Sequence, residues 1–140
     1  MKNINVLLDT NILLDWLLDR KPYADNAIGV LKLCNTGTIK GYVAAHSITN
    51  IFYIARKQLT LDELKGIIKN LMSIVTVVPI DADNIRKAME LMEFSDIEDA
   101  IQTQCAIDVN TDYILTRNEK DFNASKIKVI DYDAFNKLLD

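Results

Sequence analysis

A carboxylate, a hydroxyl and an amide follow directly after the first apolar segment of the chain, in the stretch VLLDTN. These groups belong to Asp9, Thr10 and Asn11, and a helical pattern begins at once. A side chain at this point can cap the helix by accepting a hydrogen bond from a free backbone amide. A carboxylate here can also bind a divalent cation. The pattern at this position alone favours the cap.

A second group of acids, Asp96, Glu98 and Asp99, falls within one turn of a later helical pattern. Asp96 and Asp99 are three residues apart, so they share one face of a helix. The helix dipole favours acids in a first turn, which is one explanation for them. Three acids in one turn nevertheless repel one another more than capping requires, and a bound cation would relieve that repulsion.

Two further polar clusters are candidates. The segment TRNEKDF (116–122) is either a solvated turn or part of a site, because it follows a strand that the pattern predicts to be buried. Asn50 is an amide inside an otherwise apolar helix. The single histidine, His46, is expected to act as a cap or a satisfied hydrogen-bond partner, and it excludes a zinc site built on several histidines.

Length and composition indicate one soluble domain over residues 1–140, with 49% hydrophobic and 26% charged residues. The net charge of −4 gives no general attraction to nucleic acid, although a local basic patch could provide one. No apolar run reaches the roughly 18 residues of a membrane span, so we expect no membrane partner and a cytoplasmic location. Cys34 and Cys105 lie in helical, mostly apolar patterns, which predicts buried free thiols in a reducing compartment.

Apolar periodicity and helix-start signals divide the chain into alternating strands and helices. The predicted strands are 4–8, 40–44, 74–80, 112–116 and 127–131. The predicted helices are 11–19, 22–35, 46–58, 60–73, 81–94, 95–109 and 133–139. Pro22 is expected to open its helix, Asp81 to cap one, and Thr60 and Ser95 to begin capping boxes.

This alternation predicts an α/β protein with a mainly parallel sheet. In such sheets, sites form beyond the carboxyl ends of the strands near the switch in strand order. Asp9 follows one predicted strand and Thr116 ends another, so the fold places two polar clusters at that edge. Carboxylate and amide oxygens without Cys or His suit Mg²⁺ or Mn²⁺. Such ions can activate water and stabilise an in-line displacement at phosphorus.

The ordered motifs VLLDTNILLD, AAHSITNIFYIARK, DIEDAIQTQCA and DYILTRNEKDF resemble the PIN domain, the nuclease fold of VapC-type toxins from bacterial toxin–antitoxin pairs. The resemblance covers almost the whole chain. It implies an α/β three-layer sandwich with a central, mainly parallel sheet, PIN-like and 5'-nuclease-like. It also implies cleavage of RNA that depends on Mg²⁺ or Mn²⁺.

The resemblance also assigns roles to individual residues. Asp9, Asp99 and Asp121 match the metal-binding acids of the family. The other members of the implied catalytic set are Asp96, Asn50 and Asn118, and the implied supporting residues are Thr10, Asn11, Thr116 and Glu98. Asn50 and Asn118 stand where the family usually carries acids, which predicts weaker metal binding.

Partners follow from the resemblance as well. The implied partners are RNA, an antitoxin protein and a second copy of the chain in a homodimer. Residues 11–35 and 46–73 could form a protein interface, or they could be ordinary core. The cations expected to contact phosphates, or else to form a solvated face, are Arg56, Lys57, Arg117 and Lys120.

Three other functions are weighed against the ribonuclease. The amides at Asn50 and Asn118 favour a catalytically weakened PIN-like module that binds nucleic acid or protein. A phosphoryl-transfer enzyme could use Asp9 as its nucleophile, but Asn11 stands where such enzymes carry a second acid. A Rossmann nucleotide site is disfavoured because no glycine-rich turn follows the first strand.

Overall fold

The computed structural model describes residues 3–91, 96–122 and 125–139. Within this part of the chain, five strands form one parallel sheet in the order β3-β2-β1-β4-β5. The strands are β1 (Ile4–Leu8), β2 (Ile39–Ala44), β3 (Thr76–Val78), β4 (Tyr113–Leu115) and β5 (Lys128–Ile130). β1 is the central strand: Val6 lies opposite Gly41 of β2 on one side and Tyr113 of β4 on the other.

The helices that join the strands are mostly short and amphipathic. They are α1 (Thr10–Leu17), α2 (Ala24–Thr36), α3 (Ala45–Ala55), α4 (Leu61–Ile74), α5 (Ala82–Met89), α6 (Ile97–Asp108) and α7 (Tyr132–Leu138), with a 3-10 turn, η1 (Glu119–Phe122). None of these described helices is both long enough and apolar enough to cross a membrane.

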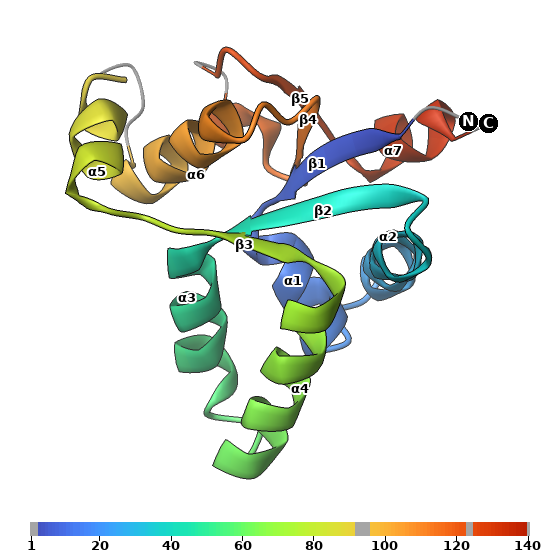
Figure 1. The fold of residues 1–140 in the computed structure, drawn as a ribbon. Coiled ribbons are helices and arrows are strands. Elements are labelled where there is room, and N and C mark those ends of the chain that lie inside the picture. The colour runs from blue at the N-terminus through green and yellow to red at the C-terminus, as the bar shows by residue number, and fades with distance from the viewer. Residues whose placement is uncertain (1–2, 92–95, 123–124, 140) are drawn as a thin grey trace.

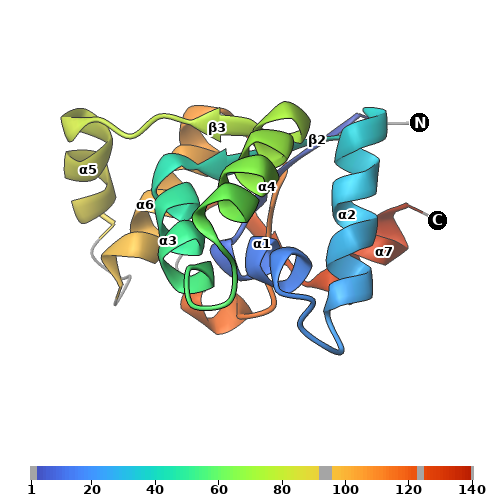
Figure 2. The same cartoon turned by 90° about the horizontal axis from the view of Figure 1, so that it is seen from below.

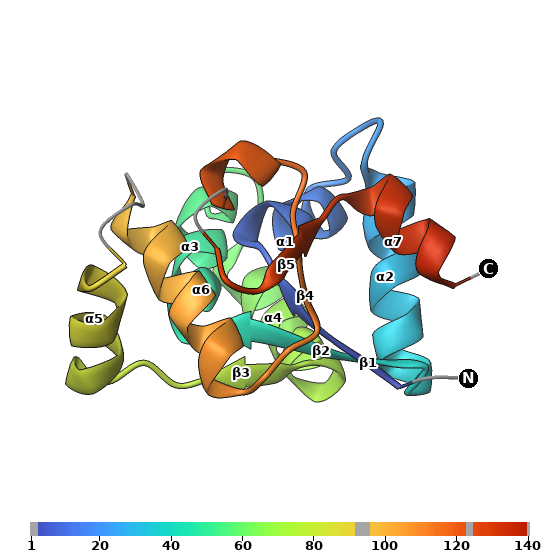
Figure 3. The same cartoon turned by 90° about the horizontal axis from the view of Figure 1, so that it is seen from above.

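Helices cover both faces of the sheet, which gives three layers. Side chains alternate along β1, so Val6 and Leu8 face one core and Leu7 faces the other. The first core includes side chains of α1, α2, α3, α4 and α7, and α1 to α4 lie together below the sheet (Figures 1 and 2). The second core includes Cys105 and Ala106 of α6, which crosses the opposite face with α5 beside it (Figure 3). The predicted fold class, a three-layer α/β sandwich with a parallel central sheet, is confirmed.

Local signals predicted some helix starts correctly. Thr60 and Glu63 form the expected capping box, and Asp81 caps α5 by accepting a hydrogen bond from the amide of Asn84. Cys34 and Cys105 are buried and free, as predicted.

Several predicted boundaries are wrong, among them the end of the helix predicted at 46–58, which stops at Ala55. Pro22 does not open α2: the amides of Tyr23 and Ala24 both donate to the Arg20 carbonyl, so a turn precedes the helix. The strand predicted at 74–80 is shorter, because Ile74 still belongs to α4. The helix predicted to reach residue 94 ends at Met89, and residues 92–95, including the predicted cap Ser95, lie outside the described part of the chain.

Candidate active site

Asp9 lies where the strand order of the sheet switches direction. From β1 the chain first adds β2 and β3 on one side, and later β4 and β5 on the other. The backbone amide of Asp9 donates to the Leu115 carbonyl at 3.0 Å, so the ends of β1 and β4 meet. Asp9 and Thr116 are therefore neighbours at the edge of the sheet that the sequence indicated.

The carboxylate of Asp9 is not used as a helix cap. Asp9 occupies the cap position of α1, but its side chain makes no capping hydrogen bond. One oxygen accepts from Gln102 Nε2 at 2.9 Å and the other from Thr116 Oγ1 at 2.8 Å. Thr116 Oγ1 also accepts from the amide of Asn118 at 3.0 Å. The capping interpretation of Asp9 is therefore wrong.

The environment of Asp9 opposes its negative charge. The residue is 5% exposed, and within the described part of the chain it makes no ion pair. Burial raises the pKa of its carboxyl group, and the hydrogen bonds from Gln102 and Thr116 only partly offset this effect. A cation placed beside Asp9 would therefore be bound favourably.

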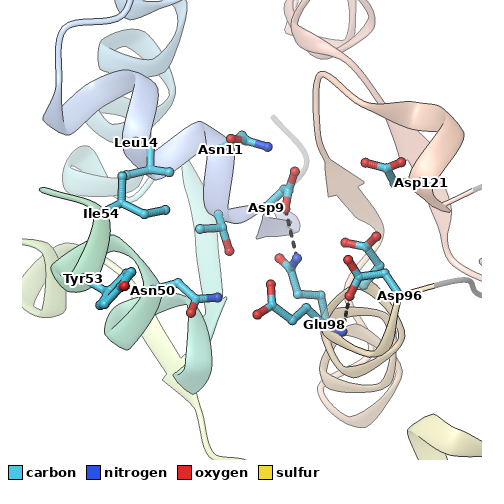
Figure 4. A pocket seen from close by; sticks show the side chains of 12 residues that line it. Asp9, Asn11, Leu14, Asn50, Tyr53, Ile54, Asp96, Glu98 and Asp121 are labelled. Atoms are coloured by element: carbon cyan, nitrogen blue, oxygen red, sulfur yellow. Dashed lines mark hydrogen bonds between the residues drawn. The ribbon is translucent and has the colours of Figure 1, made fainter.

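A pocket of about 420 Å³ opens beside Asp9 (Figure 4). The described residues that line it are Asp9, Thr10, Asn11, Leu14, Asn50, Tyr53, Ile54, Asp96, Glu98, Asp99, Gln102 and Asp121. Five of them carry carboxyl groups, and none is Lys or Arg. Carboxylates from the start of α1, the start of α6 and η1, which are distant in sequence, thus share one pocket.

These carboxyl groups interact electrostatically. The pKa of Asp99 is raised to about 7, first by burial and then by the charges of Asp96, Asp9, Asp121 and Glu98. Repulsion of this kind disfavours simultaneous ionisation of all the acids. Asp96 is nevertheless also a helix cap, because its carboxylate accepts from the Glu98 amide at 2.8 Å.

The residue types fit a hard divalent cation, although they do not form a closed cage. Carboxylate and amide oxygens are the ligands that Mg²⁺ and Mn²⁺ prefer. Among the described residues, however, no three Asp, Glu, His or Cys side chains come close enough together to hold an ion. The pocket supplies ligand types and negative charge, and its acids would have to draw closer to bind one ion together.

Most of the predicted site residues meet in this pocket. Those that line it are Asp9, Thr10, Asn11, Asn50, Asp96, Glu98, Asp99 and Asp121. The hydroxyl of Thr10 lies 2.8 Å from that of Ser47, which joins α1 to α3. Thr116 and Asn118 are not part of the lining, and both belong to the hydrogen-bonded chain that reaches Asp9.

The predicted phosphate-binding cations do not line the pocket. The guanidinium of Arg117 pairs with Asp15 through two hydrogen bonds of 3.0 and 3.2 Å and lies over the ring of Tyr23. The guanidinium of Arg56 lies over the ring of Tyr53, 3.9 Å from its centroid. Lys57 and Lys120 are exposed. Arg117 is thus committed to an internal ion pair, whereas Arg56 stands beside a residue of the pocket.

Sequence reasoning missed two buried residues. Gln102 is 2% exposed and holds Asp9, and its position three residues after Asp99 on one helix face was an available signal. Asp15 is completely buried, and nothing in its apolar helix pattern indicated a distant cation. His46 does not cap α3, whose cap position is Ala44, and burial lowers the pKa of its ring although the charge and the backbone of Glu98 oppose this shift.

Comparison with known proteins gives one family. A family model described as the PIN domain matches residues 5–120. Ribonuclease VapC1 of Aquifex aeolicus is 26% identical, and the matching region covers 96% of this chain and 95% of the relative.

Solved structures show the same fold. The crystal structure of VapBC2 from Rickettsia felis, bound to a DNA fragment from their promoter, contains a chain that matches with a TM-score of 0.71 at 15% identity, over 91% of this chain and 98% of that one. The DNA-bound VapBC structure from Salmonella typhimurium also matches with a TM-score of 0.71, at 16% identity, over 92% and 98% of the two chains.

Proposed function

This chain belongs to the PIN domain family, and on that basis we propose that it is a divalent-cation-dependent ribonuclease. The named ribonuclease from Aquifex aeolicus, which aligns over nearly the full length of both chains, supports this reaction class. The observation that carries the proposal is the position of Asp9 at the switch in strand order. Its carboxylate is buried, has no cationic partner in the described part of the chain and shares one pocket with four more acids.

The acids have distinct roles in the proposed site. Asp9, Asp99 and Asp121 hold Mg²⁺ or Mn²⁺, with Asp96 in the same pocket and Asn118 joined to Asp9 through the hydroxyl of Thr116. When bound, such an ion supplies an activated water and stabilises charge on the phosphate undergoing displacement. Gln102 and Thr116 orient the Asp9 carboxylate, the task that hydrogen-bond partners of metal ligands generally perform.

Cleavage of a labelled single-stranded RNA panel in Mn²⁺, Mg²⁺ or EDTA tests the proposal. We expect cleavage that requires the metal and falls at least about 100-fold in Asp9→Asn, because even the partners of metal ligands are worth 10- to 100-fold. Asp25→Asn, the same change at an exposed aspartate of α2, is the matched control and should retain full activity. Equal cleavage by wild type and Asp9→Asn would point to a contaminating nuclease and overturn the proposal.

We further propose a protein partner of the antitoxin type and a location in the cytoplasm. The similarity to VapBC structures supports the partner. An apolar groove of about 300 Å³ between α3 and α4, with Ile48, Phe52 and Ile68 in its lining, offers a surface for this protein partner.

Assembly into a homodimer is proposed from the family resemblance. Light scattering of the chain, alone and after co-expression with its adjacent gene product, tests both kinds of assembly.

A catalytically weakened binding module is the second candidate. The absence of a group of three close acids among the described residues favours it, together with the amides at Asn50 and Asn118. Metal binding separates the two candidates, because a ligand that binds only the folded state raises the melting temperature. A clear rise in millimolar Mn²⁺, absent from Asp9→Asn, supports the ribonuclease, and no rise supports the binding module.

A further inference from the structure

The pocket beside Asp9 has two chemically different walls. Asp96 and Glu98 of α6 and Asp121 of η1 form an acidic wall. Leu14 of α1 and Asn50, Tyr53 and Ile54 of α3 form the facing wall, which carries no charge (Figure 4). Asp9 lies between the two. A metal site alone would require only the acidic wall, so the uncharged wall needs its own explanation.

Tyr53 is the most exposed residue of the uncharged wall. Its side chain is 63% exposed, and that of its neighbour Ile54 is 39% exposed. An aromatic ring held open to solvent at a pocket edge is a stacking surface for flat, partly apolar groups.

A cation accompanies this ring. The guanidinium of Arg56 lies over the Tyr53 ring and donates from Nη1 to the Tyr53 carbonyl at 2.9 Å. The described lining of the pocket itself contains no Lys or Arg, and Arg56 adds a positive charge beside the uncharged wall. A ligand with an aromatic group and an anionic group could stack on the Tyr53 ring and pair with the Arg56 guanidinium.

Asn50 adds a polar group on the same helix face. It precedes Tyr53 by three residues and Ile54 by four, so the three side chains lie side by side on α3. An amide both donates and accepts hydrogen bonds, as the edges of nucleobases do. Asn50 lines the pocket next to Tyr53 and Ile54, so its amide can reach the edge of a base that stacks on these two side chains.

We propose that Asn50, Tyr53 and Ile54 form a nucleobase subsite for one unpaired nucleotide of an RNA strand. The base stacks on Tyr53 and Ile54, Asn50 hydrogen-bonds to its edge, and the backbone runs between Arg56 and the acids. The inference rests on the proposed ribonuclease function and adds one contact to it: the subsite takes an unpaired base, because a paired base is stacked within its duplex and leaves no face free. The pocket, at about 420 Å³, is in the size range of sites for small ligands.

A binding titration tests the subsite separately from cleavage. Asp9→Asn protein in Mg²⁺ is titrated with a short single-stranded RNA containing 2-aminopurine, whose fluorescence falls when it stacks. We expect quenching with single-stranded RNA and none with the same sequence in a duplex. Adding Tyr53→Ala should weaken binding about 5- to 150-fold and remove the quenching, whereas Tyr53→Phe should preserve both.

Two further variants complete the test. Leu61→Ala removes a similarly exposed apolar side chain from α4 and should leave RNA binding unchanged. Asn50→Ala should reduce the difference in affinity among RNAs that vary only at the quenched position.

The outcomes separate the subsite from the proposed function. If wild type cleaves RNA but Tyr53→Ala binds it as tightly as the parent protein, the subsite is overturned and the ribonuclease stands. If Tyr53→Ala alters only the binding of a protein partner, the wall is a protein interface and the subsite is again overturned. If wild type neither binds nor cleaves RNA, both proposals fail.

Discussion

Two buried aspartates, Asp9 and Asp15, stand six residues apart in the sequence and have opposite surroundings. Asp15 is completely buried, and it accepts two hydrogen bonds from Arg117 and a third from Tyr132 Oη at 2.9 Å. Asp9 is almost as deeply buried, but its two side-chain donors, Gln102 and Thr116, are neutral. Among the residues that the structure describes, one internal carboxylate therefore has a cationic partner and the other has none.

The side chains that meet at Asp15 come from segments that are distant in the sequence. Arg117 follows β4, Tyr132 begins α7, and Tyr23, which stacks on Tyr132 with ring centroids 6.4 Å apart, precedes α2. Arg117 also directly follows Thr116, the residue that holds Asp9. The ion pair thus fixes the segment between β4 and η1 against α1.

The difference in partners indicates that the Asp15 carboxylate has a structural role, whereas the Asp9 carboxylate belongs to the candidate site. A buried charge is tolerated when a partner compensates it, and it is costly otherwise. Uncompensated acids with raised pKa values, gathered in a cleft, are typical of functional sites. Asp15 is paired within the fold, whereas Asp9 is the carboxylate that we propose to bind an external cation.

Among the substitutions that test this comparison, Asp15→Asn is expected to lower the free energy of unfolding most. The substitution leaves Arg117 without its counter-ion, and breaking a buried pair in this way costs about 3 to 5 kcal/mol. We expect about 3 kcal/mol, the lower end of that range, because the Arg117 side chain is 24% exposed and can turn toward water. Urea denaturation, monitored by circular dichroism, measures the loss.

Asp9→Asn is the matched change and should alter the free energy of unfolding by no more than about 1 kcal/mol. It removes an uncompensated charge and keeps a side chain of the same shape. Equal destabilisation by the two substitutions would contradict the division into a structural and a functional carboxylate.

A smaller effect is expected when a neutral partner of Asp9 is removed. Gln102→Leu should weaken Mn²⁺ binding about 10- to 100-fold, because Gln102 orients a proposed metal ligand. Stability should fall by about 1 kcal/mol, because one oxygen of the buried Asp9 carboxylate loses its Gln102 donor. Calorimetric titration with Mn²⁺ measures the affinity.

Gln104→Leu provides the control for this measurement. Gln104 is also a buried glutamine of α6, but it donates to Asp108 at 2.9 Å, away from the pocket lining. Its replacement should leave Mn²⁺ affinity unchanged. If the two leucine variants bind Mn²⁺ equally well, Gln102 has no role in orienting Asp9 for the metal.

The sequence predicted the parts of this molecule that depend on local pattern. Alternating apolar segments and helix caps indicated every strand of the described sheet, and the parallel order then brought Asp9 near Asp99. The boundaries near Pro22 and Ile74 were wrong because turn hydrogen bonds and helix continuation decided them, not residue preference.

The remaining features depend on contacts between residues far apart in the sequence, which the local hydrophobic pattern does not reveal. Asp15 meets Arg117 across 102 positions of the sequence, so the pair could not be inferred from either local pattern. Gln102 looked like one more residue of a helix. Arg117 was expected to contact phosphate groups because it is a cation in a polar loop. Only the fold shows that its charge is already paired with Asp15.

The smallest expected effect concerns Asp99 and the pH dependence of stability without metal. The pKa of Asp99 is about 7 in the folded protein, against 3.8 for an ordinary aspartate, so the folded state holds this proton to higher pH than the unfolded state does. The stabilising contribution of the protonated group is therefore complete below about pH 4 and is lost as the pH rises through about 7. We expect the free energy of unfolding in EDTA to decline over this window by about 1 kcal/mol or less, because Asp99 is only half-buried and water screens the repulsion.

Asp99→Asn should remove that decline. Asp62→Asn, the same change at an exposed aspartate of α4, is the control and should leave the decline unchanged. His46 titrates in all three proteins, so the difference between their urea midpoints at pH 5 and pH 8 isolates Asp99. A decline that persists unchanged in Asp99→Asn would show that the acids of the pocket do not repel one another through this residue, and the contrast with Asp15 would then rest on Asp9 alone.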